Sequence, residues 1–468
     1  MTDWNDASLA AILEGSPVAG AYSLDYVRAM TQGWSLPSGN GAEWVGASPR
    51  RRRRRLVAED FSGEVLVIPV GRPVLRTNDL NFPFRPASDH MWLVGDTEPG
   101  SVLVLGPDGD ETLFAVDHLP LGHPLSFLEP HGALWEGPRD SLGALATRLG
   151  IRTRPLDELE ERLRGARART VRGIDPRVDT LVQDDGRELE TQLARRRLHK
   201  DAYEVEQLRH VADVAVAGFE AVARVLGDVA DQGEALVEGV FTKVARARGR
   251  GLASIPIVGG GPRATIPHWQ RNDERVGPEE LVLLDAGVEG PELYTSDVAR
   301  TMPVSGHFTT AQRDVHDIVH AAHEAALAAT KPGAPFLEPH RAAQVVLLDG
   351  LSSLGVLPNP AFDELVVGER GRRWTLHTTS HMLGIDVHDC MPLVKEYMSG
   401  DLEPGHVLTV EPGLYFSPYD DHVPQELRGI GVRIEDDLVV TNDGIEVLTA
   451  ALPTSSAGVE AWISDCAG

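Results

Sequence analysis

Cysteine is scarce in this chain: the 468 residues include only Cys390 and Cys466. Two cysteines exclude a disulfide framework and a zinc site built from thiolates. Long apolar runs are also missing, since no stretch approaches the roughly 18 consecutive apolar residues of a membrane helix. The first residues lack the basic start and the uninterrupted apolar segment of a secretory signal. We therefore expect a cytoplasmic protein without membrane contact.

Positive charge is in short supply as well. Lys and Arg number 44 and Asp and Glu number 70, so the net charge is −26. A body this acidic repels phosphate, which argues against nucleic acid as a general partner. The exception is the unbroken basic run from Arg50 to Arg55. Because the rest of the chain is acidic, we interpret this run as a solvated helix face rather than a nucleic-acid or membrane patch.

The length predicts two or three domains, and a hydrophobic content of 42% is typical of a globular protein. Residues 1–40 are expected to form a helical or irregular lead-in. Short β-branched segments at 64–71 and 101–106 predict strands, and 135–170 alternates helical and strand-like pieces. We therefore expect residues 1–188 to form an α/β domain, followed by a charged linker that runs into a helix.

Residues 189–468 are expected to form a second domain. Its helices and strands are mixed without regular alternation, which indicates an α+β fold. One predicted helix carries His316, His320 and His323 on one face, and we interpret them as a polar shoulder rather than as metal ligands. Apolar spacing predicts helices at 201–226, 309–330 and 338–354, and strand signals occur at 281–287, 296–304, 406–413 and 431–440.

Acidic residues in strand-like segments are the main chemical signal, because Asp and Glu are poor strand formers and costly to bury. Asp285 and Asp297 flank Gly290-Pro291. A hairpin folded about this dipeptide would place the two carboxylates opposite each other, and they would then need a proton or a cation between them. The alternative is that both lie at strand ends and face water.

Glu411 and Glu435 repeat this signal further along the chain. Arg433 lies two residues before Glu435 and is expected to hold that carboxylate ionised from the same sheet face. The segment HTTSHMLGIDVHD supplies histidines without the Glu of an HExxH zinc helix. Four carboxylates and one imidazole suit two divalent ions of the manganese, cobalt or zinc type.

The order Asp285, Asp297, His381, Glu411, Glu435 resembles the five-ligand site of the pita-bread metallopeptidases, in the Xaa-Pro aminopeptidase and prolidase branch. The motifs LLDAG, YTSDVARTMPVSGHFTTAQ, EPGHVLTVEPGLY and GIGVRIEDD match this family closely. In the first half, RTNDLNFPFRPASDHMWLVGDTEP resembles the same branch. The resemblance covers about residues 60–450.

The resemblance implies a C-terminal pita-bread (creatinase/aminopeptidase) fold after a creatinase-like domain that restricts access and supports a homo-oligomer, a dimer or a tetramer. It implies two metal ions, with manganese favoured and cobalt or zinc as alternatives. Asp297 and Glu435 would bridge the ions, Asp285 would bind one of them, and His381 and Glu411 would complete the other. The remaining family positions near the substrate are His268, His377, His388, Tyr415 and Arg433.

The implied activity is release of the N-terminal residue from peptides with proline at the second position, by a water that the two ions activate. His388 would hydrogen-bond the developing oxyanion, and Glu411 would carry a proton to the prolyl nitrogen. The proline pocket would be formed by His377, His388, Tyr415 and Arg433, and His268 would complete the catalytic set.

One departure from the family concerns the loop before the EPG turn, where many relatives carry an arginine and this chain has Lys395. A lysine cannot make the bidentate contact of an arginine. A prolidase that cleaves only Xaa-Pro dipeptides therefore stays open as an alternative, as does phosphotriester hydrolysis as a side activity. The five filled ligand positions argue against a non-catalytic pita-bread binding module and against a metal-free creatinase-type hydrolase.

Overall fold

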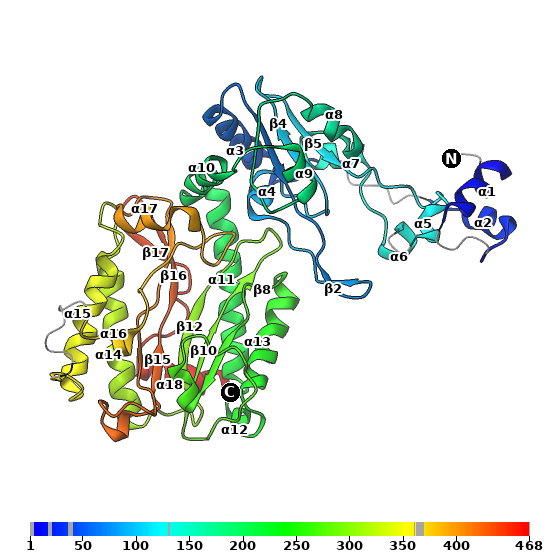
Figure 1. Cartoon of the computed structure of the whole chain (residues 1–468). Helices are drawn as coiled ribbons and strands as arrows, with labels where there is room; N and C mark the ends of the chain where they lie inside the picture. Colours follow the sequence, from blue (N-terminus) through cyan, green and yellow to red (C-terminus); the bar gives the residue numbers. More distant parts are fainter. Residues whose placement is uncertain are drawn as a thin grey trace. The chain divides into compact units, whose positions relative to one another are not determined.

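The computed structural model divides the chain into two compact units, Met1–Gln192 and Leu193–Gly468 (Figure 1). The expected domain boundary between residues 188 and 189 falls within helix α10 (Arg187–Leu198), where a linker running into a helix was expected. Among the described helices, none is both long and apolar enough to cross a membrane. The structure describes residues 4–16, 21–35, 41–129, 132–359, 361 and 369–467.

The N-terminal unit is built on a five-stranded mixed sheet in the order β6-β5-β4-β1-β7. The strands predicted at 64–71 and 101–106 are β1 and β4, which pair antiparallel at its centre. Valines of both strands pack with Phe114 and with Leu159 in the core, as expected of an α/β domain. The expected lead-in contains α1 and α2, and its residues 1–3, 17–20 and 36–40 lie outside the described residues. The described elements are β1 (Val65–Pro69), β2 (Leu75–Thr77), β3 (Leu80–Asn81), β4 (Val102–Leu105), β5 (Glu111–Ala115), β6 (Arg152–Pro155), β7 (Ala168–Thr170), α1 (Asp6–Glu14), α2 (Leu24–Met30), α3 (Ala47–Asp60), α4 (Ser88–Leu93), α5 (Leu125–Leu128), α6 (Ala133–Glu136), α7 (Leu142–Leu149), α8 (Leu159–Leu163) and α9 (Pro176–Leu181).

The basic run lies in a helix, α3, as expected, but its interpretation as a solvated face is wrong for three of its six arginines, which are buried: Arg50, Arg53 and Arg54. Arg54 is fully buried: its Nη1 donates to the Leu93 carbonyl at 2.9 Å, and its Nε pairs with Glu111 at 2.8 Å. The carbonyls at the end of a helix have no partner inside the helix and carry partial negative charge. Three arginines of α3 satisfy the end of α4 in this way, because Arg50 donates to the Met91 carbonyl and Arg53 to the Trp92 carbonyl, at 3.0 and 3.1 Å.

The C-terminal unit has the expected α+β architecture. Its long strands lie between the packed pair α14–α15 and the packed pair α11–α13 (Figure 1). The helices predicted at 201–226, 309–330 and 338–354 are α11, α14 and α15, and Asp201 and Thr309 cap the first two with capping boxes. The described elements are β8 (Gly251–Leu252), β9 (Ile257–Gly260), β10 (Leu281–Ala286), β11 (Val288–Glu289), β12 (Val298–Pro303), β13 (Val407–Val410), β14 (Gly413–Tyr415), β15 (Gly431–Arg433), β16 (Asp436–Val440), β17 (Ile445–Val447), α11 (Ala202–Ala223), α12 (Val229–Gln232), α13 (Glu234–Arg248), α14 (Thr310–Ala329), α15 (Glu338–Ser353), α16 (Arg372–Thr375), α17 (Val394–Ser399) and α18 (Ser456–Ala467).

The histidines of α14 correct a second interpretation. His316 and His323 are fully buried, so they do not form a polar shoulder of the helix. The Nε2 atom of His323 lies 3.1 Å from the carboxylate of Asp436, which also pairs with Arg300 at 2.7 Å. His323 therefore points towards β16, where the buried carboxylate of Asp436 is its polar partner in place of water.

Candidate metal centre

The hairpin of β10 and β12 carries two of the predicted ligands. Asp285 lies in β10 opposite Ala299, not opposite Asp297, so the predicted register is wrong by two residues. The turn is closed by a hydrogen bond from the Gly290 amide to the Tyr294 carbonyl, around a three-residue loop rather than a tight turn at Gly290-Pro291. A shift of two residues keeps Asp297 on the same sheet face as Asp285, at a diagonal position.

The other carboxylates lie where strands end. Glu411 follows β13 directly, and Glu435 occupies the break between β15 and β16, where its amide donates to the Ala299 carbonyl at 3.0 Å. Asp297 precedes β12 by one residue. Only Asp285 lies inside a strand. The alternative in which Asp285 and Asp297 face water is also wrong, because Asp297 is 8% exposed and the side chain of Asp285 is 13% exposed.

These chain segments converge on one cluster of possible ligands. Asp297, His381 and Glu435 each offer a ligand atom, and the three atoms lie within 4.8 Å of one another. The Nε2 atom of His381 lies 3.4 Å from Asp297 Oδ2 and 3.6 Å from Glu411 Oε1. Its Nδ1 donates to the Met382 carbonyl at 3.1 Å, which leaves Nε2 directed into the cluster.

The electrostatics of the cluster favour a bound cation. Burial and the neighbouring carboxylates raise the pKa of Asp285 to about 6 and of Glu411 to about 7, and they raise the pKa of Glu435 well above its ordinary value. Burial opposes the charged form of His381, but Asp297 and Glu411 together raise its pKa to about 9. Oxygen donors and one imidazole, crowded in a buried site, fit a divalent ion of the transition series.

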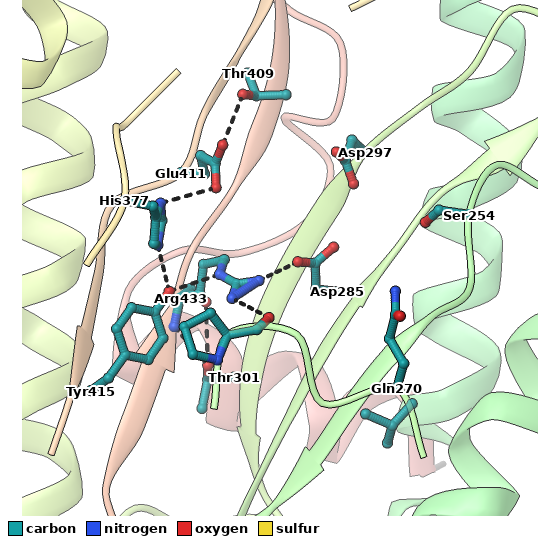
Figure 2. A network of polar contacts seen from close by, with 12 residues as sticks. Ser254, Gln270, Asp285, Asp297, Thr301, His377, Thr409, Glu411, Tyr415 and Arg433 are labelled. Atoms are coloured by element: carbon teal, nitrogen blue, oxygen red, sulfur yellow. Dashed lines mark hydrogen bonds and ion pairs between the residues drawn. The ribbon is translucent and has the colours of Figure 1, made fainter. Parts of the chain in front are cut away.

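A chain of polar contacts forms one wall beside this cluster (Figure 2). Arg433 Nε donates to Tyr415 Oη at 2.8 Å, and Tyr415 Oη donates to His377 Nε2 at 2.7 Å. The Nδ1 atom of His377 donates to the Thr378 carbonyl at 2.8 Å and lies 3.4 Å from Glu411 Oε2. Burial and the charge of Arg433 lower the pKa of His377 to about 3, so this imidazole is neutral.

The partner of Arg433 differs from the prediction. Its Nη1 forms an ion pair with Asp285 instead of Glu435, and its Nη2 donates to the Pro267 carbonyl at 3.0 Å. The alternation of side chains holds only within a continuous strand. Since β15 ends at Arg433, Glu435 no longer shares its face, and the guanidinium turns towards β10.

The last two predicted residues are exposed side chains at the edge of the site. The ring of His388 packs edge-on against His381, with 4.4 Å between centroids. Burial and the charge of His381 lower the pKa of His388. The charge of His268 contributes to the lowered pKa of both His377 and His388, so His268 faces the same space.

Sequence reasoning missed Asp437, which supports the cluster from behind. Both of its carboxylate oxygens accept from the Asp297 amide, at 3.0 and 3.3 Å, and the side chain is buried. A signal was present, because two further acidic residues directly follow Glu435 at the start of an apolar strand. The sequence offered no means of telling which backbone group they would hold.

Comparison with known proteins identifies the family of each unit. Residues 206–442 match the family model of metallopeptidase family M24, and residues 50–172 match that of the aminopeptidase P N-terminal domain. The Xaa-Pro aminopeptidase 2 of Streptomyces coelicolor is 44% identical over 427 residues, covering 89% of this chain and 91% of the relative. The Xaa-Pro aminopeptidase of Escherichia coli is 33% identical, covering 88% and 96%.

Solved structures agree with the sequence comparison. Escherichia coli aminopeptidase P with the inhibitor Pro-Leu superimposes with a TM-score of 0.80 at 30% identity, covering 91% of this chain and 99% of that structure. Proline aminopeptidase P II from Yersinia pestis gives 0.79 at 30% identity, covering 89% and 99%. The expected pita-bread fold with its N-terminal domain is thereby confirmed. This chain belongs to metallopeptidase family M24 and carries an N-terminal domain of the aminopeptidase P type.

Proposed function

We propose that this protein is a metal-dependent Xaa-Pro aminopeptidase, which releases the first residue of peptides whose second residue is proline. The observation that carries the proposal is the convergence of Asp297, His381 and Glu435 within 4.8 Å, beside a polar wall of neutral and cationic side chains. The relatives that carry this activity in their names match nearly the whole chain, which supports the same reaction here.

The proposal includes two divalent ions, with manganese favoured and cobalt or zinc able to replace it. Asp297 and Glu435 are the proposed bridging ligands, with Asp285 on one ion and His381 and Glu411 on the other. Bound ions of this kind lower the pKa of a water molecule and polarise the carbonyl of the scissile bond. A zinc-substituted Escherichia coli aminopeptidase P has been solved with product, which supports tolerance for more than one metal.

The side chains around the cluster have separate tasks in the proposed reaction. An Xaa-Pro bond is a tertiary amide, so its nitrogen offers no N–H and the leaving group must receive a proton. Glu411 is the proposed proton carrier, because its Oε2 faces His377 and the substrate wall. His388, exposed beside His381, is the proposed donor to the developing oxyanion.

Recognition of the substrate proline is assigned to the polar wall formed by Arg433, Tyr415 and His377. The hydrogen bonds between Arg433, Tyr415 and His377 hold three side chains in fixed positions before the substrate arrives. A pre-formed wall avoids the entropy cost of ordering side chains around a proline ring. We further propose that the chain forms a homo-oligomer, a dimer or a tetramer, which the N-terminal unit supports, and that this unit restricts access to the catalytic unit. Sedimentation velocity tests the oligomer.

The decisive experiment compares peptide substrates after the metal has been controlled. The protein is treated with a chelator, reloaded separately with manganese, cobalt or zinc, and assayed with an Xaa-Pro dipeptide and an Xaa-Pro-Yaa tripeptide. We expect the highest kcat/KM for the tripeptide with manganese, and no cleavage of an Xaa-Ala-Yaa control. Strong preference for the dipeptide would identify a prolidase instead, and failure with every metal would refute the peptidase function.

A further inference from the structure

Two aspartates flank His388 in sequence, and two buried cations hold them. Nη2 of Arg197 lies 2.7 Å from Asp386 Oδ2 and forms a closer contact with Asp389. Lys200 Nζ lies 3.0 Å from the other carboxylate oxygen of Asp389, and both of these side chains are only 1% exposed. The exposed histidine therefore stands between two anchored acidic neighbours.

Backbone hydrogen bonds hold the start of the loop that carries His388, where the Thr295 amide and hydroxyl both donate to the Gly384 carbonyl at 2.9 Å. The Asp389 amide donates to the Met382 carbonyl at 2.8 Å, which closes the loop at its base. A Cβ atom at Gly384 would overlap the Asp389 carboxylate, so this carboxylate lies directly against the backbone of the same loop. His388 itself is exposed and its ring packs on one side against His381, so the Asp389 anchor is a second constraint on its position.

The two cations come from the junction of α10 and α11. Arg197 belongs to the last turn of α10, and Lys200 lies just before the capping box of α11. The Lys200 amide donates to the Gly405 carbonyl at 2.8 Å, which fixes the backbone from which its side chain extends. Burying a lysine costs free energy even when it is paired, so the pair of Lys200 with Asp389 contributes little net stability to the fold. A role in positioning the loop is an alternative reason for its presence.

We infer that Arg197 and Lys200 are positioning residues for His388. They fix the carboxylates on either side of it and so set the distance between its imidazole and the reacting carbonyl. The inference rests on the proposed function, in which His388 donates to the oxyanion. A displacement of about 1 Å at such a donor costs up to about a hundredfold in rate, while substrate binding is spared.

The test uses the manganese-loaded full chain and removes the pair as a unit. Lys200→Met alone leaves one oxygen of the buried Asp389 carboxylate without its cation, while Arg197 still pairs with the other oxygen. The main variant is therefore Lys200→Met with Asp389→Asn, which removes both charges of this pair at similar volume. We expect kcat on the tripeptide to fall by about 10- to 100-fold, with KM changed less than about twofold and metal content unchanged. The single substitution Lys200→Arg keeps the positive charge beside Asp389 and should retain most of the wild-type kcat. The matched control is Arg209→Met, which breaks the pair between α11 and Glu446 and should leave kcat unchanged.

A double-mutant cycle separates positioning from general stability. In a His388→Ala background the same pair removal should lower kcat by less than about twofold, because the group being positioned is already gone. The imidazole signal of His388 in proton–carbon NMR, assigned by its loss in His388→Ala, should shift in the pair variant. This signal is independent of turnover.

Three outcomes decide the matter. An unchanged His388 signal overturns the inference, whether or not the protein cleaves peptides. An equal loss of kcat with and without His388 overturns it as well, since the pair would then act on something else. Wild-type protein that cleaves no Xaa-Pro peptide refutes the proposed function, while a His388 signal that shifts between the wild type and the pair variant still supports the positioning role.

Discussion

At the scale of single residues, the site concentrates negative charge where water is scarce. Glu435 is 1% exposed and lies among three other carboxylates that raise its pKa. Such a group destabilises the folded protein when it is ionised and unpaired. A bound cation would pair with the Glu435 carboxylate and remove this destabilisation.

Replacement of Glu435 by alanine tests its proposed bridging role. We expect kcat/KM to fall by more than about a hundredfold, because even outer-shell partners of a metal typically contribute 10- to 100-fold. Metal content measured by mass spectrometry should fall in parallel. Unfolding of the N-terminal unit should be unaffected, since Glu435 belongs to the other unit. Near-full turnover would rule out the bridging assignment.

A second residue-scale prediction concerns protons. Without metal, the pKa of Glu411 is raised to about 7 and that of His381 to about 9, so the protein near pH 7 holds protons on groups that must lose them to bind a cation. The pKa of Glu435 is also raised well above its ordinary value. Metal affinity should therefore rise with pH, with more than one proton released near pH 7. Titration calorimetry in buffers of different ionisation enthalpy measures this number. An affinity that stays constant between about pH 6 and pH 8 would contradict the shifted pKa values.

At the scale of elements, the contact of α3 with α4 shows how a basic run becomes structural. The arginines of α3 lie one helical turn or less apart, so they meet successive carbonyls at the end of α4. Arg54 is also within 2.8 Å of Glu111 in β5, which ties the helix pair to the sheet. The run therefore contributes to the stability of the N-terminal unit rather than to a binding surface.

Paired substitutions within α3 test this conclusion. Arg54→Met should destabilise the N-terminal unit by about 3 kcal/mol, because it leaves the Leu93 carbonyl and the Glu111 carboxylate without their partner. Arg55→Met changes an exposed neighbour in the same helix and should cost less than about 0.5 kcal/mol. Urea unfolding followed by circular dichroism measures both. Equal effects of the two substitutions would restore the interpretation of α3 as a solvated face.

At the scale of the whole molecule, the proposed metal chemistry belongs to one unit. All five proposed metal ligands lie in Leu193–Gly468, and the N-terminal unit has its own sheet and its own apolar core. Two cores with separate sheets favour separate unfolding transitions. A ligand stabilises only the unit that binds it.

Removal of the metal should therefore act on one transition. With manganese at about 100 times its dissociation constant, the C-terminal unit gains about 2.7 kcal/mol, which corresponds to a rise of about 5 °C or more in its Tm. Scanning calorimetry with and without a chelator should show this shift in one transition and none in the other. Equal shifts in both transitions would indicate that the units unfold together.

Local patterns in the sequence determined much of this protein. Apolar spacing and the Asp201 and Thr309 caps located α11 and α14, and acidic residues in strand-like segments, together with the family motifs, identified the carboxylates of the site. Only tertiary structure decided the register that places Asp285 opposite Ala299, the turn of Arg433 towards Asp285, the burial of His323 and the ion pair of Lys200 with Asp389. Helix caps and strand patterns depend on interactions between near neighbours in the chain, which a sequence displays directly. The hairpin register depends on the length of its turn, which the packing of the two strands sets. The other partners lie 100 residues or more apart and are chosen by the packing of whole elements, and several pairings of the same charges satisfy the sequence equally well.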